Sequence, residues 1–170
     1  DALDKTSKSG SYDTHSVAFS SDDRYLLSRG YEFLGLYDIS NRKLVREIRD
    51  TYLGDDYKSP ASISPNGQLV AAVNGSSIKL WEIFSGQINT ILKGHSGGIS
   101  ALTFSDDSRY IISGGYDNTA RLWDIKTGRE MAKLVAFADN NWIVITPEGY
   151  YNSSLNGHNY LNIRMGINVY

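Results

Sequence analysis

Short apolar runs alternate with polar turns along most of the chain, with the two-residue period typical of β-strands. A strand, a polar turn and a second strand occur in each of four stretches, which begin at Ser16, Ser59, Ser100 and Trp142. The best helical candidate, residues 44–49, also alternates as a strand would. The pattern therefore predicts an all-β protein.

The four stretches are units of a repeat. The last apolar residue before the turn in each unit is Phe19, Ile63, Phe104 or Ile145, and successive anchors lie 44, 41 and 41 residues apart. An aromatic residue followed by an acid comes 18 or 19 residues after each of the first three anchors, at 37–38, 81–82 and 123–124. A turn and a further alternating run complete each of these units, so each holds four short strands.

A lone four-stranded sheet of this size leaves both faces uncovered, whereas stacked sheets bury them. The repeat therefore predicts a β-propeller section built of four-stranded antiparallel blades. We expect five segments along the chain: an N-terminal extension at 1–11, blade 1 at 12–50, a linker and blade 2 at 51–93, blade 3 at 94–135, and a degenerate fourth blade or closing segment at 136–170.

The third unit, GHSGGISALTFSDDSRYIISGGYDNTARLWDIKTG, resembles a repeat of the WD (tryptophan-aspartate) family, and the resemblance extends over about residues 12–154. It implies a structural tetrad of four hydrogen-bonded side chains at His95, Ser113, Asp117 and Trp123. The other units depart from the pattern, since Tyr37 replaces the tryptophan in unit one and Ala72 replaces the serine in unit two. Those units are expected to depend on apolar packing.

Residues 94–98 also fit G-x-S-x-G, the turn that presents a nucleophilic serine in α/β-hydrolases. The order Ser96, Asp124, His158 follows that of a hydrolase triad. However, Ser96 precedes an alternating strand pattern rather than a helix, and Asp124 belongs to the repeated Trp-Asp pair. We expect no catalytic residue in this chain, and a serine hydrolase that uses Ser96 is the less favoured alternative.

Composition excludes several classes of site. The net charge of −2 does not favour nucleic-acid binding, and no apolar run is long enough for membrane insertion. The absence of cysteine excludes thiolate chemistry, and the three histidines lack metal-ligand spacing. We expect no metal and no cofactor. The compartment stays open, and a soluble protein of the cytoplasm or periplasm is the expectation.

The end of the chain resembles the closing segment of bacterial WD-repeat signalling proteins, on the residues Trp142 to Tyr151. From the WD-repeat resemblance we expect an interaction scaffold without chemistry of its own. The alternative is a regulatory propeller of a bacterial peptidase or kinase whose catalytic domain lies elsewhere. Because propellers have 4–8 blades, we expect self-association or further blades to close the ring. The first residue, Asp1, favours a piece of a longer chain.

A partner-binding face is expected where the blade-to-blade links and the turns between second and third strands meet. The residues predicted there are Arg29, Tyr31, Tyr52, Tyr57, Asn74, Ser96 and Tyr116. Tyrosine and arginine dominate binding hot spots, which favours protein partners. The alternative is that the tyrosines only pack against neighbouring blades. The turns at 41–42, 85–86 and 126–128 are expected at the opposite end, as solvated turns.

Overall fold

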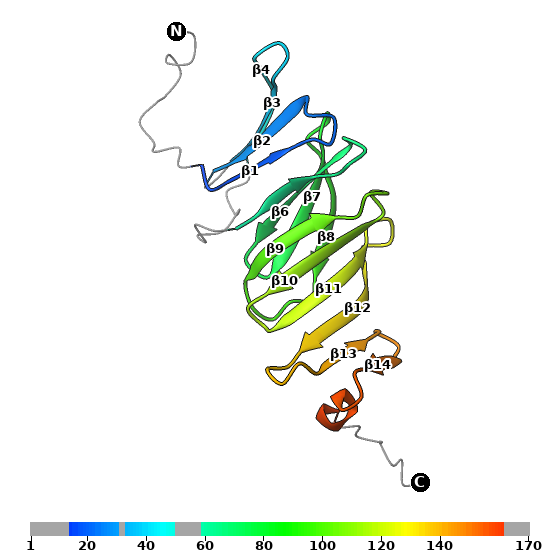
Figure 1. Ribbon diagram of the computed structural model, residues 1–170. Coiled ribbons are helices and arrows are strands. Elements are labelled where there is room, and N and C mark those ends of the chain that lie inside the picture. Colours follow the sequence, from blue (N-terminus) through cyan, green and yellow to red (C-terminus); the bar gives the residue numbers. More distant parts are fainter. Residues whose placement is uncertain (1–13, 31–32, 50–58, 162–170) are drawn as a thin grey trace.

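The chain forms three antiparallel β-sheets that follow one another in sequence order (Figure 1). The computed structural model describes residues 14–30, 33–49 and 59–161. The first strands of the three sheets lie next to one another, since β1 (Ser16–Phe19) contacts β5 (Ala61–Ile63) and β5 contacts β9 (Ile99–Phe104). This stacking of antiparallel sheets is that of a β-propeller section, as the repeat predicted.

Each of the first two sheets is one blade of four strands in sequence order, and the third holds six strands in the order β14-β13-β12-β11-β10-β9. Blade 1 contains β1, β2 (Tyr25–Arg29), β3 (Phe33–Asp38) and β4 (Lys43–Arg49). Blade 2 contains β5, β6 (Leu69–Asn74), β7 (Ser77–Glu82) and β8 (Ile88–Lys93). The third sheet contains β9, β10 (Tyr110–Gly115), β11 (Thr119–Asp124), β12 (Arg129–Ala136), β13 (Trp142–Ile145) and β14 (Tyr151–Ser153). We use "blade 3" for β9 to β12.

The turn between the first and second strands is built alike in every blade. A serine hydroxyl accepts a hydrogen bond from the backbone N–H of the residue five positions later, so the side chain closes the turn. The pairs are Ser20 with Tyr25 at 2.8 Å, Ser64 with Leu69 at 2.9 Å and Ser105 with Tyr110 at 3.0 Å. The polar turns found in the sequence therefore have a common hydrogen-bonded form.

The fourth strand of each blade carries one extra residue opposite the third strand. The pairing between these strands shifts between Leu36 and Tyr37, between Leu80 and Trp81, and between Leu122 and Trp123. The unpaired residues are Val45, Asn89 and Met131. Such bulges change the direction in which neighbouring side chains point.

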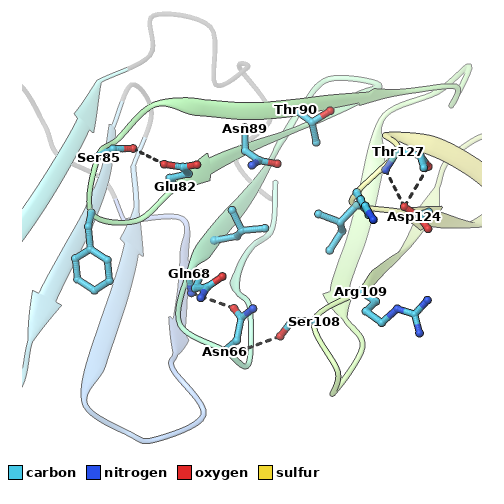
Figure 2. A pocket seen from close by; sticks show the side chains of 14 residues that line it. Asn66, Gln68, Glu82, Ser85, Asn89, Thr90, Ser108, Arg109, Asp124 and Thr127 are labelled. Carbon is cyan, nitrogen blue, oxygen red and sulfur yellow. Dashed lines mark hydrogen bonds between the residues drawn. The ribbon is translucent and has the colours of Figure 1, made fainter.

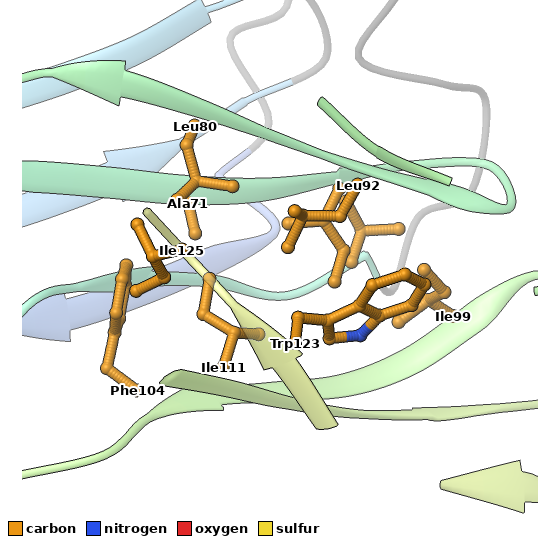
Figure 3. Packing of buried hydrophobic residues seen from close by; sticks show 10 residues of the cluster. Ala71, Leu80, Leu92, Ile99, Phe104, Ile111, Trp123 and Ile125 are labelled. Carbon is orange, nitrogen blue, oxygen red and sulfur yellow. The ribbon is translucent and has the colours of Figure 1, made fainter. Parts of the chain in front are cut away.

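Two hydrophobic cores lie at the boundaries between blades. The core between blades 1 and 2 contains Leu27, Leu36, Val70 and Trp81 among its buried residues. The core between blades 2 and 3 packs residues of β6, β7 and β8 against others of β9, β10 and β11, with Trp123 at 1% exposure among them (Figure 3). Blade 2 is thus covered on both faces, which is why β6 has four consecutive buried residues.

The outer face of blade 3 exposes positions that blade 2 buries. Ile112 pairs with Leu122 as Ala71 pairs with Leu80, so the two positions are equivalent in the repeat. Ala71 is 0% exposed, whereas Ile112 is 49% exposed. Blade 1 exposes apolar side chains on its own outer face, at Val17 and Phe19. These two faces are where further blades or a second chain are expected to pack.

The segment after Ala136 continues the sheet of blade 3, because β13 pairs with β12 over residues 133–136. A tight reversal joins the two strands, with the Phe137 N–H donating to the Asn141 carbonyl at 2.8 Å and Asn140 at a φ of 63°. We expected a degenerate fourth blade or closing segment over 136–170. Its strand–turn–strand part is present as β13 and β14, and the domain boundaries stay predictions.

One turn of 3-10 helix, η1 (Gly157–Tyr160), follows β14. The Tyr160 ring stacks on Phe137 with 4.0 Å between ring centres, and its hydroxyl donates to Asp139 at 2.6 Å. These contacts hold the turn against the β12–β13 reversal. Within the described residues, no helix is long and apolar enough to span a membrane.

Candidate functional site

The four side chains of the predicted tetrad form one hydrogen-bonded chain in blade 3. The indole Nε1–H of Trp123 donates to Ser113 Oγ at 2.8 Å, and Ser113 Oγ lies 2.8 Å from His95 Nε2. His95 Nδ1 lies 2.9 Å from Asp117 Oδ2. Because an ionised carboxylate only accepts, we assign the ring proton to Nδ1 and let Ser113 donate to Nε2. With this assignment, every hydrogen bond that links the four side chains has one donor and one acceptor.

Two strands and two connecting segments bring the tetrad together. Ser113 lies on β10 and Trp123 on β11, and these strands are hydrogen-bonded neighbours. Asp117 lies in the turn between them, while His95 comes from the link between β8 and β9. Ser113 is 1% exposed and Trp123 is equally buried, so the tetrad connects the core to the loops at one end of the blade.

Sequence reasoning missed further partners of Asp117. Thr119 Oγ1 donates to Asp117 at 2.8 Å, the Ser96 N–H donates to it at 3.0 Å, and the Arg121 guanidinium lies 3.5 Å away. Burial raises the pKa of Asp117, but hydrogen bonds from Thr119, Ser96 and His95 outweigh it and hold the pKa well below its usual value. Thr119, Arg121 and Trp123 share one face of β11 by alternation, a signal that was present in the sequence.

Ser113, His95 and Asp117 have the connectivity of a hydrolase triad, but the serine is inaccessible. Ser113 Oγ already accepts the indole N–H, and its residue is 1% exposed, so no substrate carbonyl reaches it. Ser96, the serine of the G-x-S-x-G pattern, is exposed and contributes its backbone N–H to Asp117. Asp124 accepts from Thr127 in its own turn, and His158 lies on η1 beyond β14. The structure therefore does not assemble Ser96, Asp124 and His158.

The structure describes four of the seven predicted partner-binding residues: Arg29, Asn74, Ser96 and Tyr116. Asn74, Ser96 and Tyr116 lie at the same end of blades 2 and 3, where the Gly75 carbonyl accepts from Ile99 and the Gly98 carbonyl accepts from Tyr116. Tyr116 is 69% exposed. Tyr31, Tyr52 and Tyr57 lie outside the described residues.

The expectation for Arg29 needs correction, since its side chain is 0% exposed and lines no accessible surface. Its guanidinium donates to the Ser59 carbonyl at 3.0 Å and the Val73 carbonyl at 3.1 Å. Both carbonyls belong to the neighbouring blade. Arg29 therefore joins blades 1 and 2 instead of facing a partner.

Within the ranges that the structure describes, no three histidine, cysteine or acidic residues are placed to hold a metal ion. Among the described residues, a groove of about 860 Å³ lies between blades 2 and 3, at the end opposite to Tyr116 (Figure 2). Sequence analysis expected only solvated turns at that end.

We compared the sequence with models of known protein families. Residues 86–124 match the family described as WD domain, G-beta repeat. This part of the chain is therefore similar to a WD repeat. The matched range includes all four tetrad residues and runs from the end of the β7–β8 turn to the end of β11. The matched range is thus offset from the blade by one strand, since it holds β8 of blade 2 and β9 to β11 of blade 3.

Relatives of this chain include proteins from a plant and from two fungi. The small ribosomal subunit protein RACK1y of Oryza sativa is 35% identical over 91 residues, which cover 52% of this chain and 27% of the relative. Nuclear distribution protein PAC1 of Arthroderma otae is 33% identical over 117 residues, covering 63% and 25%. MST50-interacting protein 11 of Pyricularia oryzae is 32% identical over 99 residues, covering 56% and 31%.

This chain spans less than a third of the length of these curated relatives. All three relatives are eukaryotic, and they do not support the expected likeness to bacterial signalling proteins.

Proposed function

We propose that this chain is a non-catalytic section of a WD-repeat propeller that binds other proteins through the loops at the Tyr116 end of blades 2 and 3. The exposed ring of Tyr116 is the observation that carries the proposal. A large aromatic ring that is already held by a rigid turn gains contact area without much loss of conformational entropy. Ser96 and Asn74 beside it supply polar rim groups.

The hydrogen-bonded network beneath this face supports the proposal, because it holds the loops in place before a partner arrives. Asp117 accepts from the Ser96 N–H, from Thr119 and from His95, so one carboxylate fixes both the blade link and the β10–β11 turn. Preorganised loops bind with a smaller entropy cost. The name of one relative, MST50-interacting protein 11, describes binding to another protein. This similarity favours protein partners for the present chain as well.

The proposal includes completion of the propeller by further blades or by a second copy of the chain. The apolar positions on the outer faces of blades 1 and 3 support it, since Ile112, Val17 and Phe19 are exposed where blade 2 buries equivalent surface. Regulation of a bacterial peptidase or kinase has no support among the relatives, and hydrolysis by Ser96 has no assembled triad.

Photo-crosslinking tests the binding face. A photoreactive phenylalanine analogue at position 116 is expected to form covalent adducts with partner proteins in the source cell. The matched control places the same residue at Arg42, an exposed turn position at the other end of blade 1. Adducts from position 42 but not from position 116 would show that the binding face has been placed at the wrong end.

A further inference from the structure

The groove between blades 2 and 3 lies at the end of the molecule opposite to Tyr116. Its walls are the β5–β6 turn, the β7–β8 turn and β8 on one side, and the β9–β10 and β11–β12 turns on the other (Figure 2). Both walls belong to described residues of this chain. The groove is therefore complete without any further blade.

The boundary between blades 1 and 2 shows what fills this position elsewhere in the repeat. Phe84 of the β7–β8 turn meets the edge of the Tyr25 ring, with 6.5 Å between ring centres and 77° between planes. Arg46 of β4 donates a hydrogen bond to the Phe84 carbonyl. Residues with three long side chains, Tyr25, Phe84 and Arg46, thus meet at this end of the first boundary.

Shorter or charged residues take the three equivalent positions at the second boundary. Leu69 replaces Tyr25, Thr90 replaces Arg46 and Lys126 replaces Phe84. The strand pairings give the first two equivalences. Tyr25 pairs with Asp38 as Leu69 pairs with Glu82, and Leu36 pairs with Arg46 as Leu80 pairs with Thr90. The turn glycines show the same relation in space. A Cβ on Gly86 would lie 3.6 Å from Arg46, and one on Gly128 would lie 3.0 Å from Thr90. The groove is open because these positions lack the side chains that fill the first boundary.

Side-chain amides face this space. Asn89 is the bulge residue of β8, and Gln68 lies in the turn before β6, both on the blade 2 wall (Figure 2). Among the described residues, neither side-chain amide has a hydrogen-bond partner. A carboxamide offers one acceptor and two donors, which match the N–H and C=O of an extended peptide backbone.

Two acidic residues, Glu82 and Asp124, and two basic residues, Arg109 and Lys126, line the groove. Glu82 accepts from Ser85 at 2.9 Å, and Asp124 accepts from Thr127 at 3.1 Å, so both wall acids are bonded within their own turns. Lys126 is exposed and has no ion-pair partner in the part of the chain that the structure describes. Its ammonium group is therefore available to a carboxylate from outside.

We propose that this groove binds an extended segment of a partner protein that carries an aspartate or glutamate side chain. Lys126 contacts the carboxylate, while Asn89 and Gln68 bond the peptide backbone. This site deepens the proposed function by adding a second surface, at the opposite end from Tyr116, with a defined ligand class.

Selection from a phage library of random peptides of about nine residues, about 30 Å long when extended, tests the site. Enriched peptides are synthesised, and their affinity is measured by fluorescence anisotropy. The groove-filling variant Thr90→Arg/Lys126→Phe installs the residues that the chain itself uses at the first boundary. Lys126→Glu reverses the charge. Ser96→Ala/Tyr116→Ala at the opposite end is the matched control, and urea unfolding checks that each variant is folded.

We expect enriched peptides to carry an acidic residue and to bind the groove-filling variant and Lys126→Glu about tenfold more weakly. Replacement of the peptide acid by its amide should weaken binding similarly, and the control variant should bind as the wild type does. Failure to enrich peptides, enrichment of basic peptides, or unchanged affinity of the folded groove-filling variant would each overturn the proposal. Loss of affinity only in the control would overturn the groove and leave the Tyr116 face standing.

Discussion

The indole N–H of Trp123 donates a 2.8 Å hydrogen bond to the hydroxyl of Ser113, deep in the boundary between blades 2 and 3. Ser113 is also hydrogen-bonded to Nε2 of His95, whose other ring nitrogen, Nδ1, is hydrogen-bonded to Asp117. A buried aromatic core residue is thereby tied to the loops that surround Tyr116. Removal of one tetrad side chain leaves its neighbours in the tetrad without a hydrogen-bond partner. The loss of stability on each substitution therefore depends on the position of the residue in the tetrad.

His95→Ala is expected to lower the free energy of unfolding by about 1–3 kcal/mol, because it strands buried partners. Trp123→Ala is expected to cost about 3–5 kcal/mol, since it also leaves a cavity. Ser96→Ala should cost little, because Asp117 bonds to the backbone N–H and not to the side chain of this residue. Urea unfolding midpoints measure all three.

Ser96→Ala also decides between scaffold and hydrolase. If it costs as much stability as His95→Ala, the role assigned to His95 is wrong. If instead it abolishes hydrolysis of an activated ester and leaves the urea midpoint unchanged, the hydrolase hypothesis replaces the scaffold.

Acid should weaken the protein through Asp117. Its pKa in the folded state is held below the value of about 3.9 expected in the unfolded chain. A group with a lowered folded-state pKa stabilises the protein at pH values above its unfolded pKa, and this contribution disappears as the pH falls through the folded-state pKa. The stability difference between wild type and Asp117→Asn should therefore be constant above about pH 5 and shrink below about pH 4. A difference that grows on acidification would contradict the assigned hydrogen bonds.

Equivalent positions of the repeat should respond differently to the same substitution. Ala71→Asn places an amide in a fully buried site between blades and is expected to destabilise by about 1–3 kcal/mol or more. Ile112→Asn changes an exposed position and should cost within about 0.5 kcal/mol. Thermal or urea unfolding of both variants checks this pair. Equal losses would indicate that the outer face of blade 3 is already covered in solution.

The exposed outer faces should also make the chain self-associate or bind a hydrophobic dye at low concentration. Ile112→Asn is expected to reduce dye fluorescence, because it removes apolar surface from one of these faces. Sedimentation of the wild type gives the state of association. A compact monomer without dye binding would contradict the exposure of these faces.

Arg29 should act as a connector between blades. Arg29→Met keeps a long apolar stem but removes the donors to the Ser59 and Val73 carbonyls, at a cost of about 1–3 kcal/mol. Arg42→Asn, at an exposed turn with a φ of 57°, is the matched loss of an arginine and should be close to neutral, since Asn tolerates this conformation. Midpoints of urea unfolding compare the two. An Arg29→Met variant as stable as Arg42→Asn would remove the connecting role.

Local pattern was enough to find the strands and the polar turns between them, and the resemblance of the third unit to a WD repeat implied the positions of His95, Ser113, Asp117 and Trp123. These features depend on alternation and on short spacings, because a strand places every second side chain on one face and a turn closes within a few residues. The same information repeats in each unit, which is why one well-formed unit identified the fold.

Contacts between blades could not be predicted from the local sequence pattern. Arg29 is buried because carbonyls 30 and 44 residues away come to lie beside it, and a residue at a strand end otherwise looks exposed in the sequence. The groove is likewise open because Leu69, Thr90 and Lys126, from three separate elements, all lack the side chains of their counterparts. The continuation of blade 3 through β13 depends on backbone pairing across a tight reversal. Each of these features arises when surfaces distant in sequence pack, and the periodicity of one strand carries no record of its neighbour across the boundary.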